Sequence, residues 1–357
     1  MAVLPRYIAR RILGSIAAAA AIIFLVISFS DFVNLITRLR DDSPATFGDL
    51  AILSLQRSPA IMEVVFPFAV LFGSIAAFVS LSRRMELVVA RASGVSVWQI
   101  VTPAVLAAAV LGALVTTVYN PVSVALQERA ITYEAALFPG AESRASGRWL
   151  RQQSEDGQSV LRARGAIEHG EKLAGVTAFV FSPAGTFEER LDAASGELHD
   201  GYWELSKVRV SRHGAAPRLH ETYRLATNLT REQVFETAVE PRNIPFWELG
   251  RVIEQWQNSG LKPERFQLHF QALLAKPAVF ATMVLLAATV SLGFARLGGV
   301  SRAILGGVIA GFVLYVAGEM AGDLGASGFI TPVVAAWAPS IVAMLLSVTV
   351  LLHQEDG

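Results

Sequence analysis

Six stretches of the chain are predominantly apolar over about 20 residues, the length that a helix needs to cross the hydrocarbon of a bilayer. They are residues 12–36, 60–79, 97–119, 268–294, 303–321 and 332–352. Single proline, glycine, serine or threonine residues interrupt the second and third stretches, which membrane helices tolerate because neighbouring groups satisfy the freed backbone. The pattern predicts an α-helical membrane protein in which three spans are followed by an insert and three more spans.

The insert between the third and fourth spans is polar, and its pattern changes along its length. Residues 120–137 are typical of a helix, whereas from about residue 148 apolar and polar positions alternate in short runs separated by turn sequences such as SPAG and RHGAAP. Such repeated short strands predict a β-sandwich or open barrel. Residues 244–261 then predict an amphipathic helix that leads into the fourth span, with Pro245 near its start and Gly260 near its end.

These boundaries predict three parts of the chain. Residues 1–138 hold the first three spans, residues 139–243 form the inserted β-domain, and residues 244–357 contain the connecting helix and the last three spans.

A short charged segment joins the second and third spans. On a helical wheel its apolar residues share one side: Leu81, Met85, Val88, Val89 and Ala92. The other side carries its charges, Arg83, Arg84, Arg91 and, at the border, Glu86. The pattern predicts a helix of about three turns, at about residues 82–94, which is too short to be stable alone and needs a surface to dock on. A solvated surface turn accounts for the same pattern.

The residues after this segment favour a helix end followed by a new helix. Gly94 lies where a helix stop is expected. Ser96 followed by Gln99 matches a capping box that opens the third span.

Composition narrows the class of protein. Hydrophobic residues make up 53% of the 357 residues and charged residues 17%, against about 25% charged in soluble domains. The formal net charge is zero, so no basic field indicates a nucleic-acid partner. The absence of cysteine excludes disulfides, thiol catalysis and thiolate metal sites.

The distribution of arginine predicts the orientation in the membrane, because short cytoplasmic loops are enriched in basic residues. One side of the six-span arrangement collects Arg6, Arg10, Arg11, Arg83, Arg84, Arg91, Arg296 and Arg302. We therefore expect both termini and the charged segment in the cytoplasm, and the β-domain on the far side.

Sequence motifs for catalysis are missing. No Gly-Lys dipeptide occurs, so the chain has no Walker A loop, and neither HExxH nor GxSxG occurs. The six histidines are scattered, and solvated strand faces explain them better than a metal site does. We expect no catalytic residue, no metal and no cofactor on this chain.

Ionisable residues inside or beside the spans are functional candidates by default. They are Glu63 in the second span, Lys276 in the fourth, and Glu319 and Asp323 near the end of the fifth. For Glu319 and Asp323 the simpler explanation is that both side chains reach the membrane interface. Lys276 lies deeper and is harder to explain in this way.

The order of these parts, together with several local sequences, resembles the LptF/LptG family of lipopolysaccharide export permeases. The sequences that carry the resemblance are RYIARRIL (residues 6–13), ELVVARASGVS (86–96), TNLT (227–230), SGLKPERFQLHF (259–270) and GFITPVVAAWAP (328–339). The later segments are more similar to the LptG branch than to the LptF branch. The resemblance covers nearly the whole chain.

The resemblance implies a bacterial inner-membrane permease subunit with an inserted periplasmic β-jellyroll-like domain. It implies an LptF-like permease subunit, an LptB-like ATPase dimer and an LptC-like periplasmic protein as partners, with ATP bound and hydrolysed by the ATPase. It also implies that the charged segment is a coupling helix on that ATPase, with Glu86 as its acid and Arg83, Arg84 and Arg91 around it.

The resemblance further implies that basic residues near the outer end of the first span contact lipopolysaccharide phosphates. Arg38 and Arg40 are the nearest candidates, although Asp41 and Asp42 follow them.

Three alternatives stay open on sequence alone. The chain could be the LptF-type partner of the same complex, a stand-alone secondary transporter, or a scaffold that anchors a β-domain. A secondary transporter commonly shows inverted repeats, and no convincing repeat relates the two halves here. A scaffold leaves the charged segment without a role.

Overall fold

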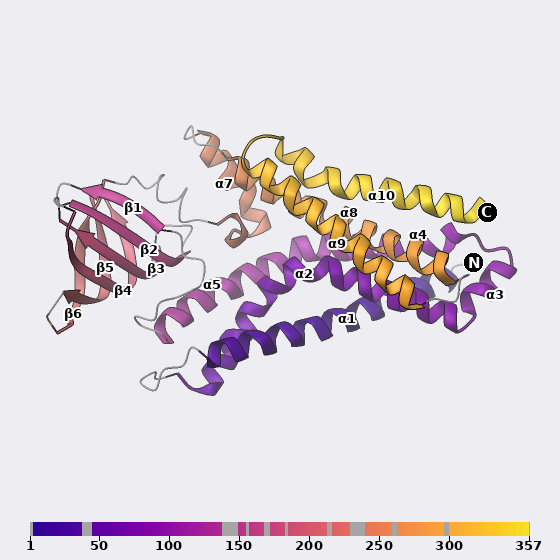
Figure 1. Cartoon of the computed structure of the whole chain (residues 1–357), viewed down its shortest axis with the longest axis horizontal. Helices are drawn as coiled ribbons and strands as arrows, with labels where there is room; N and C mark the ends of the chain where they lie inside the picture. The colour runs from indigo at the N-terminus through magenta and orange to yellow at the C-terminus, as the bar shows by residue number, and fades with distance from the viewer. Residues whose placement is uncertain are drawn as a thin grey trace. The chain divides into compact units, whose positions relative to one another are not determined.

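The computed structural model describes residues 3–37, 45–137, 149–154, 157–167, 172–182, 185–212, 216–228, 240–258, 263–295 and 300–356. Its helices are α1 (Val3–Ile36), α2 (Phe47–Arg83), α3 (Glu86–Ala92), α4 (Val97–Leu114), the π-helix η1 (Val115–Tyr119), α5 (Asn120–Leu137), the 3₁₀ turn η3 (Pro241–Asn243), α7 (Phe246–Asn258), α8 (Glu264–Ala295), α9 (Val300–Ala326) and α10 (Pro332–Asp356). Figure 1 shows their arrangement.

The six predicted spans are confirmed by helix length and composition. The described residues contain six helical stretches long and apolar enough to cross a membrane: Leu4–Ile36, Phe47–Arg83, Val97–Glu134, Glu264–Ser291, Ile304–Ala326 and Pro332–Glu355. The third stretch is continuous from α4 through η1 into α5. The helix predicted for residues 120–137 is therefore an extension of the third span.

The second span begins earlier than the hydropathy pattern predicted, at Phe47 rather than Ala60. A local cap explains this start. The Asp49 carboxylate accepts hydrogen bonds from the Thr46 backbone N–H (2.9 Å) and from the Thr46 hydroxyl (2.7 Å), which stabilises the first turn. Arg57, which precedes the predicted second span, consequently lies within α2.

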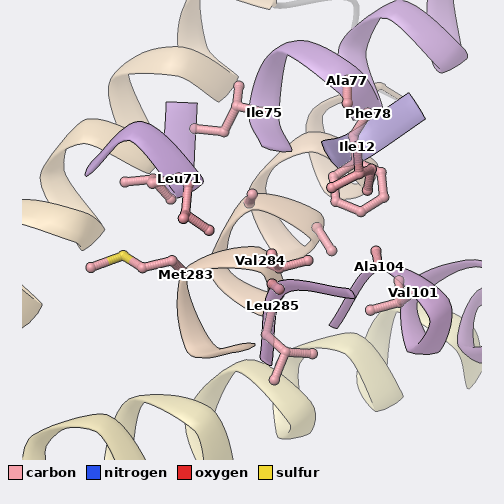
Figure 2. Close-up of a cluster of buried hydrophobic side chains, with 14 of the residues drawn as sticks. Ile12, Leu71, Ile75, Ala77, Phe78, Val101, Ala104, Met283, Val284 and Leu285 are labelled. Carbon is pink, nitrogen blue, oxygen red and sulfur yellow. The ribbon is translucent and has the colours of Figure 1, made fainter. Parts of the chain in front are cut away.

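The described chain divides into two compact units. A helical unit comprises residues 1–30, 58–123 and 245–357, and a second unit, the β-unit, comprises residues 31–57 and 124–244. Figure 2 shows part of the apolar core of the helical unit, in which α1, α2, α4 and α8 meet. The labelled residues are Ile12, Leu71, Ile75, Ala77, Phe78, Val101, Ala104, Met283, Val284 and Leu285.

Glycine allows two pairs of backbones in the helical unit to approach closely. A Cβ at position 73 would lie 2.5 Å from the Ile16 Cα, and one at position 112 would lie 2.6 Å from the Pro277 Cα. Small residues at such contacts are the usual means of tight helix packing in membranes. α2 therefore packs directly on α1, and α4 on α8.

The predicted inserted β-domain is present as one antiparallel sheet in the described residues, and its β-sandwich, open-barrel or jellyroll-like form stays a prediction. Its strands are β1 (Trp149–Ser154), β2 (Gly157–Ile167), β3 (Lys172–Phe181), β4 (Phe187–His199), β5 (Tyr202–Arg212) and β6 (Arg218–Ala226). They follow one another in sequence order across a six-stranded sheet (Figure 1). Trp203 is fully buried in its core, and its indole N–H donates to the buried Gln152 side-chain oxygen (3.2 Å).

The predicted connecting helix is also present. α7 runs from Phe246 to Asn258 and buries Phe246, Leu249, Val252 and Trp256. Because this apolar stripe packs on the helical unit, α7 belongs to that unit although it follows the β-domain in sequence.

Candidate functional site

The charged segment lies at the end of the helical unit where the chain both begins and ends. Figure 1 places α3 beside the first residues of α1 and the last residues of α10. The Tyr7 hydroxyl on α1 donates to Glu86 Oε2 on α3 (2.9 Å). Glu355 Oε1 on α10 accepts from the backbone N–H of Val97, the first residue of α4 (3.3 Å). α1 therefore contacts α3, and α10 contacts the start of α4 that follows it.

The helix within this segment is shorter than predicted. α2 continues through Arg83, and α3 spans only Glu86–Ala92, so the predicted boundaries of about 82–94 are wrong. Leu81 is buried and extends the apolar pattern of α2, whereas Met85 adopts a left-handed backbone conformation with φ of 61°. A non-glycine residue in that conformation interrupts a right-handed helix.

The end of the segment matches the prediction. Gly94 has a φ of +87°, a conformation that glycine adopts without strain at a helix end. The Gln99 backbone N–H donates to Ser96 Oγ (3.2 Å), and the Ser96 backbone N–H donates to Gln99 Oε1 (3.3 Å). The capping box at the start of α4 is confirmed.

The apolar residues of the segment point in different directions. Leu87 is 7% exposed and belongs to the core of the helical unit, whereas Met85 and Val89 are 62% and 66% exposed. One buried leucine thus anchors α3, and two apolar side chains one turn apart stay on the surface. The sequence grouped Met85 and Val89 with the apolar face but did not identify Leu87 as the anchor.

The charges beside these apolar residues are directed away from the core. Arg83 and Arg84 are exposed, and Glu86 and Arg91 are half-buried. Within the described ranges, no carboxylate lies within ion-pair distance of any of the three arginines. Tyr7, which orients Glu86, was missed as a site residue because no local pattern relates positions 7 and 86. Its only signal was its place in RYIARRIL.

Two predicted lipid contacts, Arg38 and Arg40, lie outside the described residues, as does Arg296. Within the described ranges, no group of three or more histidine, aspartate or glutamate side chains is arranged to hold a metal ion.

The ionisable residues of the spans fall into two classes. Glu319 and Asp323 are exposed near the C-terminal end of α9. Glu63 and Lys276 instead form an ion pair between α2 and α8, and their side chains are only 14% and 17% exposed. Asn120 donates from its amide to both carboxylate oxygens of Glu63, at 3.0 and 3.2 Å. We call Glu63, Asn120 and Lys276 the polar cluster.

Comparison with known proteins agrees with this architecture. The sequence profile of the lipopolysaccharide export system permease LptF/LptG matches residues 6–353. The chain is 24% identical to the lipopolysaccharide export system permease protein LptG of Escherichia coli (strain K12), with 99% of each chain covered. It is also 24% identical to the protein of that name from Haemophilus influenzae, with the same coverage. The chain therefore belongs to the LptF/LptG family of lipopolysaccharide export permeases.

Proposed function

We propose that this chain is the LptG-type subunit of an ATP-driven lipopolysaccharide exporter in the bacterial inner membrane. It pairs with an LptF-like subunit, an LptB-like ATPase dimer hydrolyses ATP beneath both, and an LptC-like protein receives the lipid for the periplasmic bridge. The chain itself performs no catalysis. Its relatives bear the LptG name and match it along 99% of its length, which favours this subunit over the LptF type.

The observation that carries the proposal is the surface formed by α3 and the residues directly before it, Arg83 to Met85. Leu87 anchors the helix in the core, while Met85 and Val89 stay exposed beside Arg83 and Arg84. A small apolar patch rimmed by charges is typical of a protein-binding surface. We assign the ATPase-coupling role to this surface, with Glu86, Arg83, Arg84 and Arg91 as its charged residues.

The fold supports a mechanical role for this surface. Tyr7 links α3 to α1, and Glu355 links the start of α4 to α10. In the same region, Arg11 on α1 donates to the Ser80 hydroxyl on α2 (3.1 Å). A rotation of α3 by a bound ATPase would therefore act on several spans at once.

The orientation of the chain in the membrane follows from the arginines at the end of the helical unit that contains α3. Arginines concentrate at the start of α1 and around α3, which favours a cytoplasmic location. With α3 in the cytoplasm, both termini share that side, and the β-domain that follows the third span lies in the periplasm. Arg38 and Arg40 remain the candidates for contact with lipopolysaccharide phosphates.

The test is co-purification of the tagged chain with its partners in detergent. Glu86→Arg should lose the ATPase because it reverses the charge at the centre of the proposed surface. Glu254→Arg is the matched control, since Glu254 is exposed on α7, and it should retain the ATPase. Equal recovery of the ATPase with both variants would contradict the proposal.

A second variant tests the orientation of Glu86. Tyr7→Phe removes only the hydroxyl that donates to Glu86 and should weaken ATPase binding by roughly fivefold, the worth of one net hydrogen bond. The unfolding temperature should change little because Tyr7 is exposed and Glu86 is half-buried. Unchanged ATPase affinity would show that Tyr7 does not position Glu86.

A further inference from the structure

Helix α8 contains a proline in its middle, and the contacts on the two sides of this residue differ in kind. Pro277 divides α8 into residues 264–276 and 277–295. Proline cannot donate to the carbonyl four residues earlier, and its ring disfavours a straight helix. Pro277 therefore cannot supply the usual N–H donor to the Leu273 carbonyl.

A side chain from another helix donates a hydrogen bond to this carbonyl. The Thr116 hydroxyl, on the π-helix η1, donates to the Leu273 oxygen (2.8 Å). Both residues are buried. One turn earlier on the same face, Gly112 lets the Pro277 backbone approach, and one turn later lies Asn120 of the polar cluster. Positions 112, 116 and 120 thus lie on one face of the third span, and this face runs along the region around Pro277.

The polar cluster lies beside this proline. Lys276 directly precedes Pro277 and pairs with Glu63 on α2, and Asn120 donates to both oxygens of Glu63. Asn120 also accepts, through its side-chain oxygen, the backbone N–H of Phe246 (2.9 Å), the first residue of α7. One asparagine therefore joins α2 to the start of α7.

α7 and the first part of α8 form one packed body. Phe246 stacks on Phe270 with ring centroids 5.5 Å apart, and Trp256 contacts Phe266 at 4.6 Å. The Trp247 indole N–H donates to the Thr117 carbonyl of η1 (3.0 Å). Polar contacts join this body to its neighbours at Thr116, Thr117, Asn120 and Glu63, and Trp337 on α10 donates to Gln271 (3.1 Å).

The second part of α8 is held mainly by apolar packing, together with two hydrogen bonds to α10: the Thr282 hydroxyl donates to the Ser340 carbonyl (3.1 Å), and the Gln354 amide donates to the Thr289 carbonyl (3.2 Å). Phe280, Met283, Val284 and Leu285 lie in the apolar core (Figure 2 labels the last three). Apolar packing is non-directional and continuous, whereas hydrogen bonds and ion pairs are lost over short displacements. Proline inside a helix is a usual cause of kinks, and π-helical turns, such as η1 beside Pro277, are frequent at functional sites.

We propose that Pro277 is a hinge and that the polar cluster holds it closed. When the Glu63–Lys276 pair separates, residues 264–276 of α8 move together with α7 relative to α2 and η1, while residues 277–295 stay in the core. The polar cluster is thereby a conformational switch within the helical unit. This inference stands independently of the ATPase-coupling role of α3.

Distance measurements on the full-length chain test the hinge. The natural sequence has no cysteine, so introduced cysteines carry spin labels at defined positions only. Ile61→Cys on α2 with Gln257→Cys on α7 reports on the proposed motion. Leu106→Cys with Leu345→Cys, which lie on α4 and α10, is the control pair. All four positions are exposed.

The decisive variant is the neutral double substitution Glu63→Gln with Lys276→Met, which leaves no buried charge unpaired. The 61/257 pair should gain a second distance, from a state populated at about 10% or less in the parent, and the 106/345 pair should not change. Lys276→Arg keeps the cation and should match the parent.

Two results would overturn the proposal. One is an unchanged 61/257 distribution in the folded double variant. The other is equal broadening of both label pairs, which would make the cluster a general support of the bundle. If the double variant does not fold, Glu63→Gln with Lys276→Gln, which replaces the pair by two amides and leaves neither charge unpaired, is measured against the same two criteria.

Discussion

The charged segment and the polar cluster place the same kinds of side chain in opposite surroundings. In the polar cluster, the Asn120 amide is buried, the Glu63 carboxylate and the Lys276 ammonium are mostly buried, and these groups bind one another. In the charged segment, Arg83 and Arg84 are exposed, and Glu86 receives one hydrogen bond from Tyr7. The first arrangement is complete within the chain, whereas the second leaves charge available to another protein.

The difference shows how location decides the role of a charge. Burial makes an unpaired charge costly, so a buried pair constrains the conformations that the chain adopts. Exposed charges add little to stability. Their identity is therefore free to match the surface of a binding partner. The polar cluster should thus affect folding and internal motion, and the charged segment should affect association.

The largest expected effect is on stability at the polar cluster. Lys276→Met leaves the Glu63 carboxylate buried without its cation and should lower the free energy of unfolding by about 3–5 kcal/mol. Arg84→Met, at the exposed segment, should change it by no more than about 0.5 kcal/mol. Thermal unfolding of both variants in the same detergent measures the difference. Similar losses in the two variants would remove the distinction between the regions.

The next effect concerns the approach of α4 to Pro277. Gly112→Ala places a Cβ against the Pro277 backbone and should cost up to about 3 kcal/mol in unfolding free energy, as overpacking does. Gly318→Ala on α9 is the matched control, because a Cβ there has no neighbour within 4 Å. This control should be neutral or slightly stabilising. If Gly112→Ala also leaves the unfolding free energy unchanged or raises it, α4 and Pro277 are not in close contact.

A smaller effect is expected from the hydroxyl that satisfies the hinge carbonyl. Thr116→Val leaves the buried Leu273 carbonyl unpaired and should cost about 1–2 kcal/mol of unfolding free energy. In Thr117→Val the lost bond is only to Ala113 within the same helix, so little change is expected. Chemical unfolding of the pair compares them directly. A larger loss from Thr117→Val would contradict the role of Thr116.

The smallest effect is a pH dependence in the β-unit, where a buried carboxylate pairs with a cation that is 66% exposed. Glu189 is buried, pairs with Arg212 and accepts a hydrogen bond from the Tyr223 hydroxyl. Burial and this hydrogen bond raise the pKa of Tyr223 from 10.0 to about 12. The folded state therefore retains a proton that the unfolded state loses above pH 10.0.

The contribution of Tyr223 to stability is complete below pH 10.0 and is lost as the pH rises towards 12. The unfolding temperature of the parent should thus fall more steeply in this range than that of Tyr223→Phe. Parallel curves for the two proteins would show that Tyr223 has no raised pKa.

Much of the fold could be predicted because it depends on local pattern. Hydropathy over 20-residue windows found all six spans, period-two alternation found the β-domain, and Ser96 with Gln99 marked the start of α4. The family sequence around Glu86 pointed to the charged segment as the candidate site. These features rest on residues that are close in sequence.

The errors arose where two local signals competed. Leu81 fits both the end of α2 and the apolar face of a separate helix, and the structure assigns it to α2 because its side chain reaches the core. The break then falls at Met85, whose left-handed conformation has no sequence signal comparable to glycine. The anchor of α3 is consequently Leu87 rather than a residue of the predicted face.

The sequence by itself therefore determined the six spans, the inserted sheet and the position of the charged segment, because periodicity and hydropathy act over one or two turns. Only the tertiary structure decided that Glu63 meets Lys276 across 213 positions and that Tyr7 meets Glu86 across 79. Such pairs form because packing brings distant helices together, and a buried charge is tolerated only where packing supplies its partner.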